Sequence, residues 1–432
     1  MSKIAYILLC HDDPAAIIEQ AKRLTSVDDY ISIHFDARSD TAHFSQISNA
    51  LKDNPNVTFA RKRIKCGWGE WSLVQATLYA VEAALEAFPR ATHFYLLSGD
   101  CMAIKTAEYV HQFLDDNDAE FIECFDFFDS DWIKTGLKDE RLIYRHFFNE
   151  RTAKGLFEAS LNLQRSFGLT RQIPQDIQVQ IGSQWWCLTR QTLSAILQDP
   201  ERATYDRYFR KVWIPDESYY QTLVRQYSGN IESRSLTLSK FDFQGKPHIF
   251  YDDHLQLLRR SDCFVARKIW PRADRLYQAF LTDTAGAMKK TEPNPGKIDR
   301  IFAKAVERRT RGRPGLYMQS RFPGRWSVNS VTSSPYSVFQ GFSELFEDFE
   351  SWLARITGAR VHGHLFAPGR AEFADGGAMI NGALSDNARI RDYNAQSFLT
   401  NLIWNTRGER QCFQFGPDDN QVISGTFARD PN

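Results

Sequence analysis

Small, charged and aromatic side chains directly follow apolar runs at several places in this chain. The run Phe94–Leu97 stops at Ser98-Gly99-Asp100, and an earlier apolar run stops at Asp36. In an open α/β sheet, residues at the carboxyl ends of the strands line the crevice where ligands bind. A carboxylate there can accept hydrogen bonds from a base, and the ring of Trp68 can stack on that base. The pattern indicates a nucleotide site, although a strand-ending Asp is also typical of a turn or helix cap.

Several common catalytic motifs are absent from the sequence. It contains no Gly-x-x-x-x-Gly-Lys-Ser/Thr, no Gly-x-Gly-x-x-Gly after an apolar run, no His-Glu-x-x-His and no Gly-x-Ser-x-Gly. Phosphate-loop hydrolysis, dinucleotide redox chemistry, zinc proteolysis and serine hydrolysis are therefore disfavoured. An Asp-x-Asp occurs at Asp129-Ser130-Asp131, but it follows the fifth predicted strand and we interpret it as a loop. Asp100 alone would be a poor metal site.

The elements that would position these residues alternate regularly over the first 125 residues. Apolar runs of strand length alternate with helix-like stretches, which predicts a mostly parallel sheet with helices on both faces. We expect strands at 4–10, 30–36, 57–64, 93–97 and 120–125, and helices at 14–24, 42–51, 72–88 and 107–114.

The rest of the chain is less regular. Helices are predicted at 151–167, 190–198, 216–226 and 253–260, and extended segments at 182–189, 234–243 and 247–251. A polar, proline-rich stretch at 289–297 indicates a boundary. We therefore expect a domain at 1–290, a linker at 291–310 and a small α+β module at 311–432. In that module, regularly spaced phenylalanines predict a helix over 338–356, with short strands at 315–321, 360–366 and 411–415.

The composition argues against some partners. Lys and Arg together number 53, equal to Asp and Glu, so the net charge is zero and a nucleic-acid partner is not expected. The seven cysteines are far apart and form no Cys-x-x-Cys pair, which favours a reducing compartment without structural zinc. The apolar run at 4–10 is too short for a leader or a membrane span, and no later run is longer. We expect a cytoplasmic protein without a transmembrane segment, which leaves peripheral association with a membrane open.

The chain from about 3 to 270 resembles the core-2/I-branching β-1,6-N-acetylglucosaminyltransferase family, glycosyltransferase family 14, which includes peptide O-xylosyltransferases. The order and spacing of seven motifs support this resemblance. They are AYILLCHD at 5–12, IHFDARS at 33–39, WGEWSLV at 68–74, LLSGD at 96–100, GSQWW at 182–186, PDES at 215–218 and FVARK at 264–268.

The resemblance implies a GT-A fold and inverting transfer from a UDP-sugar without a divalent metal or other cofactor. It identifies Glu217 as the general base and Lys268, beside Arg267, as a cation for the diphosphate. A second such cation, Lys246 or His248, is left open. The donor is expected at His11, Asp36, Arg38, Trp68, Ser98, Gly99, Asp100, Arg267 and Lys268. The acceptor is expected at Glu123, Trp132, Gln184 and Trp185.

The chemistry of inversion agrees with these roles. Displacement at an anomeric carbon needs a carboxylate to take the acceptor proton and a positive charge to stabilise the departing diphosphate. Glu217 follows Pro215 at the start of a predicted helix, whose dipole would keep the carboxylate ionised. Asp216 would cap that helix.

The sequence leaves open which sugar is donated and whether the protein is catalytic. GlcNAc is expected first and xylose second, because Gln184 stands where the resemblance places an Asp in xylosyltransferases. A catalytically silent glycan- or nucleotide-binding protein of the same fold is the other reading. The acceptor would be a saccharide or glycoconjugate.

Overall fold

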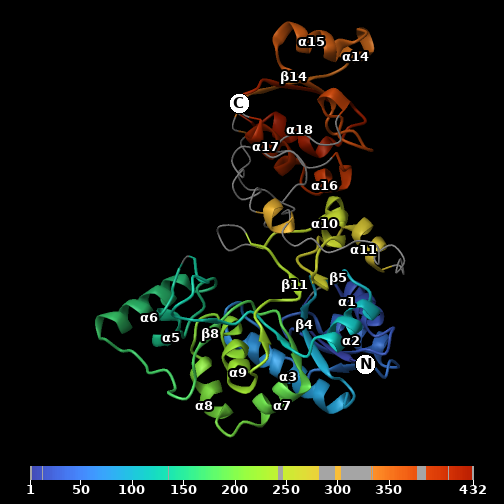
Figure 1. The fold of residues 1–432 in the computed structure, drawn as a ribbon. Helices are drawn as coiled ribbons and strands as arrows, with labels where there is room; N and C mark the ends of the chain where they lie inside the picture. The colour runs from blue at the N-terminus through green and yellow to red at the C-terminus, as the bar shows by residue number, and fades with distance from the viewer. Residues whose placement is uncertain are drawn as a thin grey trace. The chain divides into compact units, whose positions relative to one another are not determined.

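The computed structural model describes residues 2–11, 13–134, 136–241, 247–281, 297–302, 332, 334–376, 386–406 and 408–430. The chain divides into two compact units (Figure 1). The first unit comprises Met1–Leu238, Asp262–Arg267 and Gln278–Thr291, and the second comprises Ser239–Ser261, Lys268–Tyr277 and Glu292–Asn432. The predicted linker at 291–310 lies mostly outside the described residues, and the predicted domain bounds stay a prediction.

A seven-stranded mixed sheet forms the core of the first unit. Its strand order is β10-β6-β9-β4-β1-β2-β3, and β9 alone runs antiparallel to its neighbours. The predicted α/β class with a mostly parallel sheet is therefore confirmed. The strands are β1 (Ile4–Cys10), β2 (Tyr30–Phe35), β3 (Val57–Phe59), β4 (His93–Ser98), β6 (Glu120–Phe121), β9 (Cys187–Thr189) and β10 (Ile231–Glu232).

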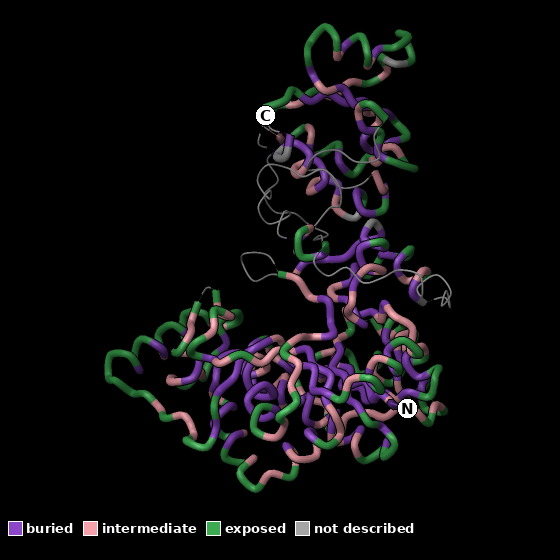
Figure 2. Tube along the Cα trace, in the orientation of Figure 1, coloured by how far each residue is buried: buried purple, intermediate pink, exposed green. Residues whose placement is uncertain are grey.

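The central strands are buried on both faces, as their unbroken apolar sequences require. In β1 every residue except Leu9 is buried, and successive side chains point to opposite faces of a strand. Figure 2 shows buried residues following the strands of this sheet. The covering helices include α1 (Pro14–Leu24), α2 (Thr41–Leu51), α3 (Trp71–Ala87) and α4 (Ala107–Asp116).

The helix boundaries follow from local chemistry. Asp13 caps α1 by accepting a hydrogen bond from the Ala16 amide at 3.1 Å, and Pro14 occupies its first position. Thr106 caps α4 through the Tyr109 amide. Alanines on the buried side of α3 allow it to pack closely on β1 and β2.

Two predicted strands of the first unit are shorter than expected. The strand predicted at 57–64 ends at Phe59, because the chain beyond it turns to bring the Ile64 carbonyl to the Ala37 amide at 3.1 Å. The strand predicted at 120–125 stops at Phe121. Beyond it, β7 (Phe125–Asp126) pairs with β8 (Gln180–Ile181) in a separate two-stranded ladder.

Helices and a small ladder complete the first unit. β11 (Thr237–Leu238), β12 (Val265–Ala266) and β5 (Met102–Ala103) form a three-stranded sheet in that order. The further helices are α5 (Glu140–Ile143), α6 (Lys154–Ser166), α7 (Arg190–Gln198), α8 (Arg202–Phe209), the 3-10 turn η1 (Pro215–Glu217) and α9 (Tyr219–Tyr227).

The second unit contains a parallel three-stranded sheet of order β13-β15-β14. Its strands are β13 (Tyr336–Phe339), β14 (Arg360–His364) and β15 (Gln411–Gln414). The predicted strands at 360–366 and 411–415 are thus confirmed, whereas that at 315–321 lies outside the described residues. The helices are α10 (Leu255–Arg259), α14 (Phe342–Leu345), α15 (Phe349–Thr357), α16 (Ala388–Tyr393), α17 (Ala395–Asn405) and α18 (Ser424–Phe427). A further helix, α11 (Asp274–Leu281), has its first four residues in the second unit and its last four in the first.

The prediction of one helix over 338–356 was wrong. The segment begins inside β13 and then forms two short helices, α14 and α15. Gly341 and Asp348 adopt left-handed φ values of 76° and 53° and interrupt it. The phenylalanines still share a hydrophobic cluster, because Phe339 packs against Phe349 from the end of the strand.

We predict that Gly182→Ala destabilises the first unit by about 1–3 kcal/mol, because an added Cβ would lie 1.9 Å from the Glu123 carbonyl oxygen. The matched control is Gly155→Ala in α6, where an added Cβ meets nothing within 4 Å. That change should be neutral or stabilise by about 0.5–1 kcal/mol. Chemical denaturation of both variants measures the difference, and equal stabilities would contradict the packing role of Gly182.

Candidate active site

The carboxyl ends of three neighbouring parallel strands meet at one edge of the large sheet. β1, β2 and β4 end there at Cys10, Phe35 and Ser98. The segments that follow are joined by backbone hydrogen bonds, from the Asp36 amide to the Cys10 carbonyl at 2.9 Å and from the Gly99 amide to the Leu9 carbonyl at 3.2 Å. The Ser39 hydroxyl also donates to the His11 carbonyl.

The Asp36 side chain is buried and fully engaged within the protein. Its carboxylate accepts hydrogen bonds from the Arg38 amide at 2.7 Å, the Arg38 Nη2 at 2.9 Å and the Cys66 amide at 3.3 Å. The Arg38 side chain is 58% exposed, so its guanidinium can leave this carboxylate at little cost. Asp36 therefore connects the end of β2 to the segment that follows β3, and Arg38 covers it from the solvent side.

Trp68 is exposed on the segment after β3. Its ring packs edge-on against Trp213 at 5.6 Å, and the Arg151 guanidinium lies over it at 3.4 Å from the ring centre. The Asn149 side chain donates to the Trp68 carbonyl at 2.8 Å and to the Glu70 carboxylate at 2.7 Å. The indole is thus held in place, with a cation on one of its faces.

The turn after β4 is tightly closed. The Cys101 amide donates to the Ser98 carbonyl at 3.0 Å, and the Ser98 hydroxyl lies 3.3 Å from the Cys101 sulfur. A Cβ added at Gly99 would come within 3.3 Å of the Cys10 Cβ. Glycine at this position therefore lets two neighbouring strand ends approach each other.

Arg267 is brought to this turn by strand register. Val265 pairs with Ala103 and Ala266 with Met102, so the next residue, Arg267, continues toward Cys101. Its guanidinium stacks over the Trp185 ring at 4.3 Å. Burial lowers the pKa of Arg267, against the opposing effects of Cys101 and Asp100. Its Nε atom is buried and has no hydrogen-bond partner among the described residues.

Lys268 belongs to the second unit. There its amide donates to the His248 carbonyl at 3.4 Å, and its carbonyl accepts from the Phe250 amide at 2.8 Å. Its expected contact with a diphosphate stays a prediction. Of the two candidates for a second cation, His248 is buried in the same unit and Lys246 lies outside the described residues.

Glu217 is held in η1 by two neighbours. The Arg141 Nη1 atom lies 3.0 Å from its carboxylate, and the Trp132 indole donates to the same carboxylate. Burial raises the pKa of Glu217, and the charge of Arg141 lowers it. The side chain is still 31% exposed, so a substrate can reach it. The expectation that a helix dipole keeps Glu217 ionised was wrong, because α9 begins only at Tyr219, two residues after Glu217. The ionised form is favoured by Arg141 and disfavoured by burial.

The turn before Glu217 is strained. Ile214 is β-branched and adopts a left-handed φ of 56°, a conformation that such residues rarely accept. Its amide donates to the Gly69 carbonyl at 3.1 Å. This bond fixes the loop containing Glu217 to the loop containing Trp68, and it gives the strain a structural reason.

Asp216 does not cap α9, contrary to expectation. Ser218 occupies the cap position, and no side-chain hydrogen bond caps this helix. The Asp216 Oδ1 atom is buried and has no hydrogen-bond partner among the described residues. Burial, followed by the neighbouring charge of Glu217, raises the pKa of Asp216 to about 7.

The expected acceptor residues divide into two places. The Gly182 amide donates to the Glu217 carbonyl at 3.0 Å, and the Ser183 amide donates to the Glu123 carboxylate at 3.0 Å, so Glu123 and the segment containing Gln184 lie beside Glu217. Trp132 joins them through its hydrogen bond to Glu217. Trp185 is only 3% exposed and lies under Arg267, on the side of the donor residues.

Two contacts of this site have no local signal in the sequence, the ion pair of Arg141 with Glu217 and the stacking of Phe125 on Trp132. Arg141 is separated from it by 76 residues and pairs with it only because the irregular segment after β7 folds back. Phe125 stacks on Trp132 at 5.9 Å between ring centres and is 38% exposed. A partly exposed aromatic pair beside a carboxylate is a surface on which a sugar ring can pack.

The Asp129-Ser130-Asp131 motif forms part of a turn. The Asp126 carboxylate accepts hydrogen bonds from the amides of Phe128 at 2.9 Å and Asp129 at 3.1 Å. Over the described ranges, no three His, Cys, Asp or Glu side chains converge as a metal site would require. None of the seven cysteines, all of which lie in the described ranges, forms a disulfide.

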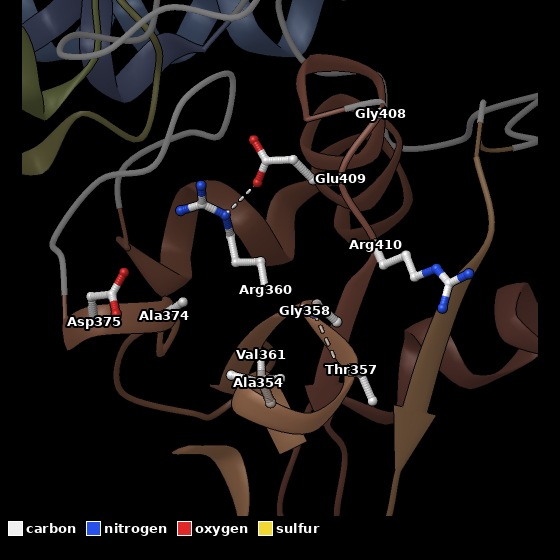
Figure 3. Close-up of a pocket in the computed structure, with 11 residues that line it drawn as sticks. Ala354, Thr357, Gly358, Arg360, Val361, Ala374, Asp375, Gly408, Glu409 and Arg410 are labelled. Carbon is white, nitrogen blue, oxygen red and sulfur yellow. Dashed lines mark hydrogen bonds and ion pairs between the residues drawn. The ribbon is translucent and has the colours of Figure 1, made fainter. Parts of the chain in front are cut away.

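Two cavities lie apart from these residues. One of about 180 Å³ in the first unit is lined by Tyr6, Tyr95 and Lys105, among others. The other, about 570 Å³, opens in the second unit where β14 and β15 begin (Figure 3). There Arg360 pairs with Glu409 at 2.7 Å.

Comparison with known families covers both parts of the chain. The family described as Core-2/I-Branching enzyme matches residues 4–257, and a family of unknown function (DUF5927) matches residues 267–432. A xylosyltransferase of Ciona intestinalis is 27% identical over 230 residues, which are 52% of this chain and 25% of that protein. Xylosyltransferase 2 of Homo sapiens is 27% identical over 229 residues, 51% of this chain and 24% of that protein. The chain spans about a quarter of the length of these relatives.

Among solved structures, the galactosyltransferase LgtC in complex with donor and acceptor sugar analogs covers 68% of this chain and 99% of its own. The TM-score is 0.32 and the identity 11%, values too low to support an inference. Within the described ranges, no helix has the length and apolar character needed to cross a bilayer.

We predict that Asp216→Asn changes how stability depends on pH. A carboxyl whose pKa is raised on folding holds its proton more tightly in the folded state, so the free energy of unfolding falls as pH rises from about 4 to 7. The variant lacks this loss. Its stability relative to wild type should therefore increase by up to about 4 kcal/mol between pH 4 and pH 8. Urea titrations at both pH values measure this, and parallel pH dependences would contradict the burial of Asp216.

Proposed function

Because the chain belongs to the core-2/I-branching enzyme family, we propose that it is an inverting glycosyltransferase that moves a sugar from a UDP-sugar to a hydroxyl of a glycan acceptor. The observation that supports this best is the Glu217 carboxylate, partly exposed between Arg141 and Trp132 and next to the Trp132–Phe125 aromatic pair.

In the proposed reaction Glu217 acts as general base. The acceptor hydroxyl oxygen attacks the anomeric carbon, its proton passes to the Glu217 carboxylate, and the bond from that carbon to the UDP oxygen breaks. Burial makes Glu217 more basic than an exposed glutamate, while Arg141 favours its ionised form. Because the two effects oppose each other, the Glu217 carboxylate can be ionised and still basic enough to take a proton near neutral pH.

The departing diphosphate would be stabilised by side chains. Arg267 directly follows β12 and reaches the turn after β4, and Lys268 follows it in sequence. Positioned charges of this kind can contribute about 3 kcal/mol to catalysis. The proposed transfer needs no divalent metal ion. Asp36, Arg38 and Trp68 would receive the uridine, with His11, Ser98, Gly99 and Asp100 along the same edge of the sheet.

The proposed donor is UDP-GlcNAc, with UDP-xylose as the second candidate. The curated relatives are named xylosyltransferases, which favours xylose. Gln184, an amide where those enzymes are expected to have an acid, favours GlcNAc. Gln184 follows Gly182 by two residues, and the Gly182 amide donates a hydrogen bond to the Glu217 carbonyl.

We predict that Glu217→Gln lowers UDP release in the presence of acceptor by about 10²–10⁴-fold, because the amide cannot accept the proton. The assay compares UDP-GlcNAc and UDP-xylose with saccharide acceptors, with and without EDTA. Unchanged turnover in EDTA is expected. Loss of activity that manganese restores would contradict metal independence.

The matched control is Glu19→Gln, at an exposed position of α1, which should keep full activity. UDP should still raise the melting temperature of the Glu217→Gln variant, which separates lost chemistry from lost binding. Full turnover by this variant would exclude Glu217 as the base. If wild type binds UDP but releases none from any donor, the silent binding protein is the correct reading.

A further inference from the structure

The segment at 140–171, here called the α6 lobe, exposes large apolar side chains on the first unit. α6 buries Phe157 and Leu161 against the protein, yet Leu156, Leu163 and Phe167 are 56%, 57% and 70% exposed. In Figure 2 this helix is largely green, in the position labelled α6 in Figure 1. Residues of this size are seldom left in water together without a partner.

The three exposed residues form one stripe. Their spacing of seven and four residues places them on the same side of a helix, within about 40° of one another. The charged residues Lys154, Glu158 and Arg165 lie on the opposite side of α6. Exposed Phe147, Phe148 and Leu169 extend the apolar surface at either end of the helix in sequence.

The charge of the lobe is positive although the chain as a whole is neutral. Its exposed charged residues are four cations and two anions, a net charge of +2: Arg145, Arg151, Lys154 and Arg165 against Glu150 and Glu158. A helix with an apolar stripe, a basic polar face and exposed phenylalanines has the properties of segments that lie in the interface of an anionic bilayer.

We propose that the α6 lobe docks on an anionic lipid bilayer, with Leu156, Leu163 and Phe167 inserted among the acyl chains and the basic residues at the headgroups.

A second apolar surface provides a contrast. Leu345, Trp352 and Ile356 in the second unit are 76%, 49% and 65% exposed. The segment that contains them, 341–358, has four acidic residues and one arginine, a net charge of −3. Anionic lipid would repel this surface, so it serves as a control that is also apolar but has the opposite charge.

The α6 lobe is connected directly to the candidate active site. Arg141 pairs with Glu217, and Asn149 binds the Trp68 carbonyl and Glu70. We therefore assign the acceptor class as a glycan on a membrane lipid. This assignment rests on the proposed function, whereas docking itself does not.

The test is flotation of the full chain with vesicles of phosphatidylcholine, with or without phosphatidylglycerol. Binding to the anionic vesicles is expected, with little binding to the neutral ones and a decrease at high salt. The double variant Leu163→Ser/Phe167→Ser should bind about tenfold more weakly. The matched double variant Leu345→Ser/Ile356→Ser should bind like wild type. Since all four side chains are exposed, none of these changes removes core packing.

Equal flotation of wild type and the α6 variant, or no flotation of wild type, would overturn the docking proposal. If the wild type forms a dimer and binds no vesicles, and the α6 variant is a monomer, the apolar surface contacts a second copy of the chain and the docking proposal is overturned. Glu217→Gln should float like wild type, so a failure of catalysis is distinguishable from a failure of docking. With active enzyme, the α6 variant should lose activity on a lipid-linked glycan and keep it on the same glycan in solution. Equal loss on both would overturn the acceptor assignment.

Discussion

The ion pair between Glu217 and Arg141 is the interaction on which the candidate site depends. Burial alone would keep this carboxyl protonated, and an unpaired buried charge is costly. The guanidinium at 3.0 Å and the Trp132 indole favour the ionised form while leaving part of the carboxylate exposed. The same pair determines the path of the irregular segment after β7, because Arg141 must return to η1 to form it. A structural and a chemical requirement are met by one contact.

A continuous series of hydrogen bonds joins this pair to the edge of the sheet. Asp36, at the end of β2, accepts from the Cys66 amide, and the loop that follows binds Ile214 through the Gly69 carbonyl. Three residues later Glu217 accepts from the Gly182 amide through its own carbonyl. Ile214, with its left-handed φ of 56°, lies within this series. Asp36 and Trp68, two of the expected donor residues, and the expected base Glu217 are therefore parts of one connected structure within the first unit.

The sequence allowed the regular part of this structure to be predicted and left the irregular part open. β1 and α1 were placed to the residue, since long apolar runs and a capped, amphipathic helix have unambiguous periods. The ion pair of Glu217 could not be foreseen, because no local pattern relates residues so distant in the chain. The helix predicted over 338–356 failed because phenylalanines from a strand and two helices can share one cluster. Asp216 was misread as a cap because its burial depends on the whole surrounding fold.

A crystal structure with bound UDP tests the central claim most directly. We expect the uracil near Asp36 and Trp68, the diphosphate against Arg267, and the Glu217 carboxylate facing the open side of the pyrophosphate. A nucleotide bound away from these residues, with Glu217 still enclosed by Arg141 and Trp132, would contradict it.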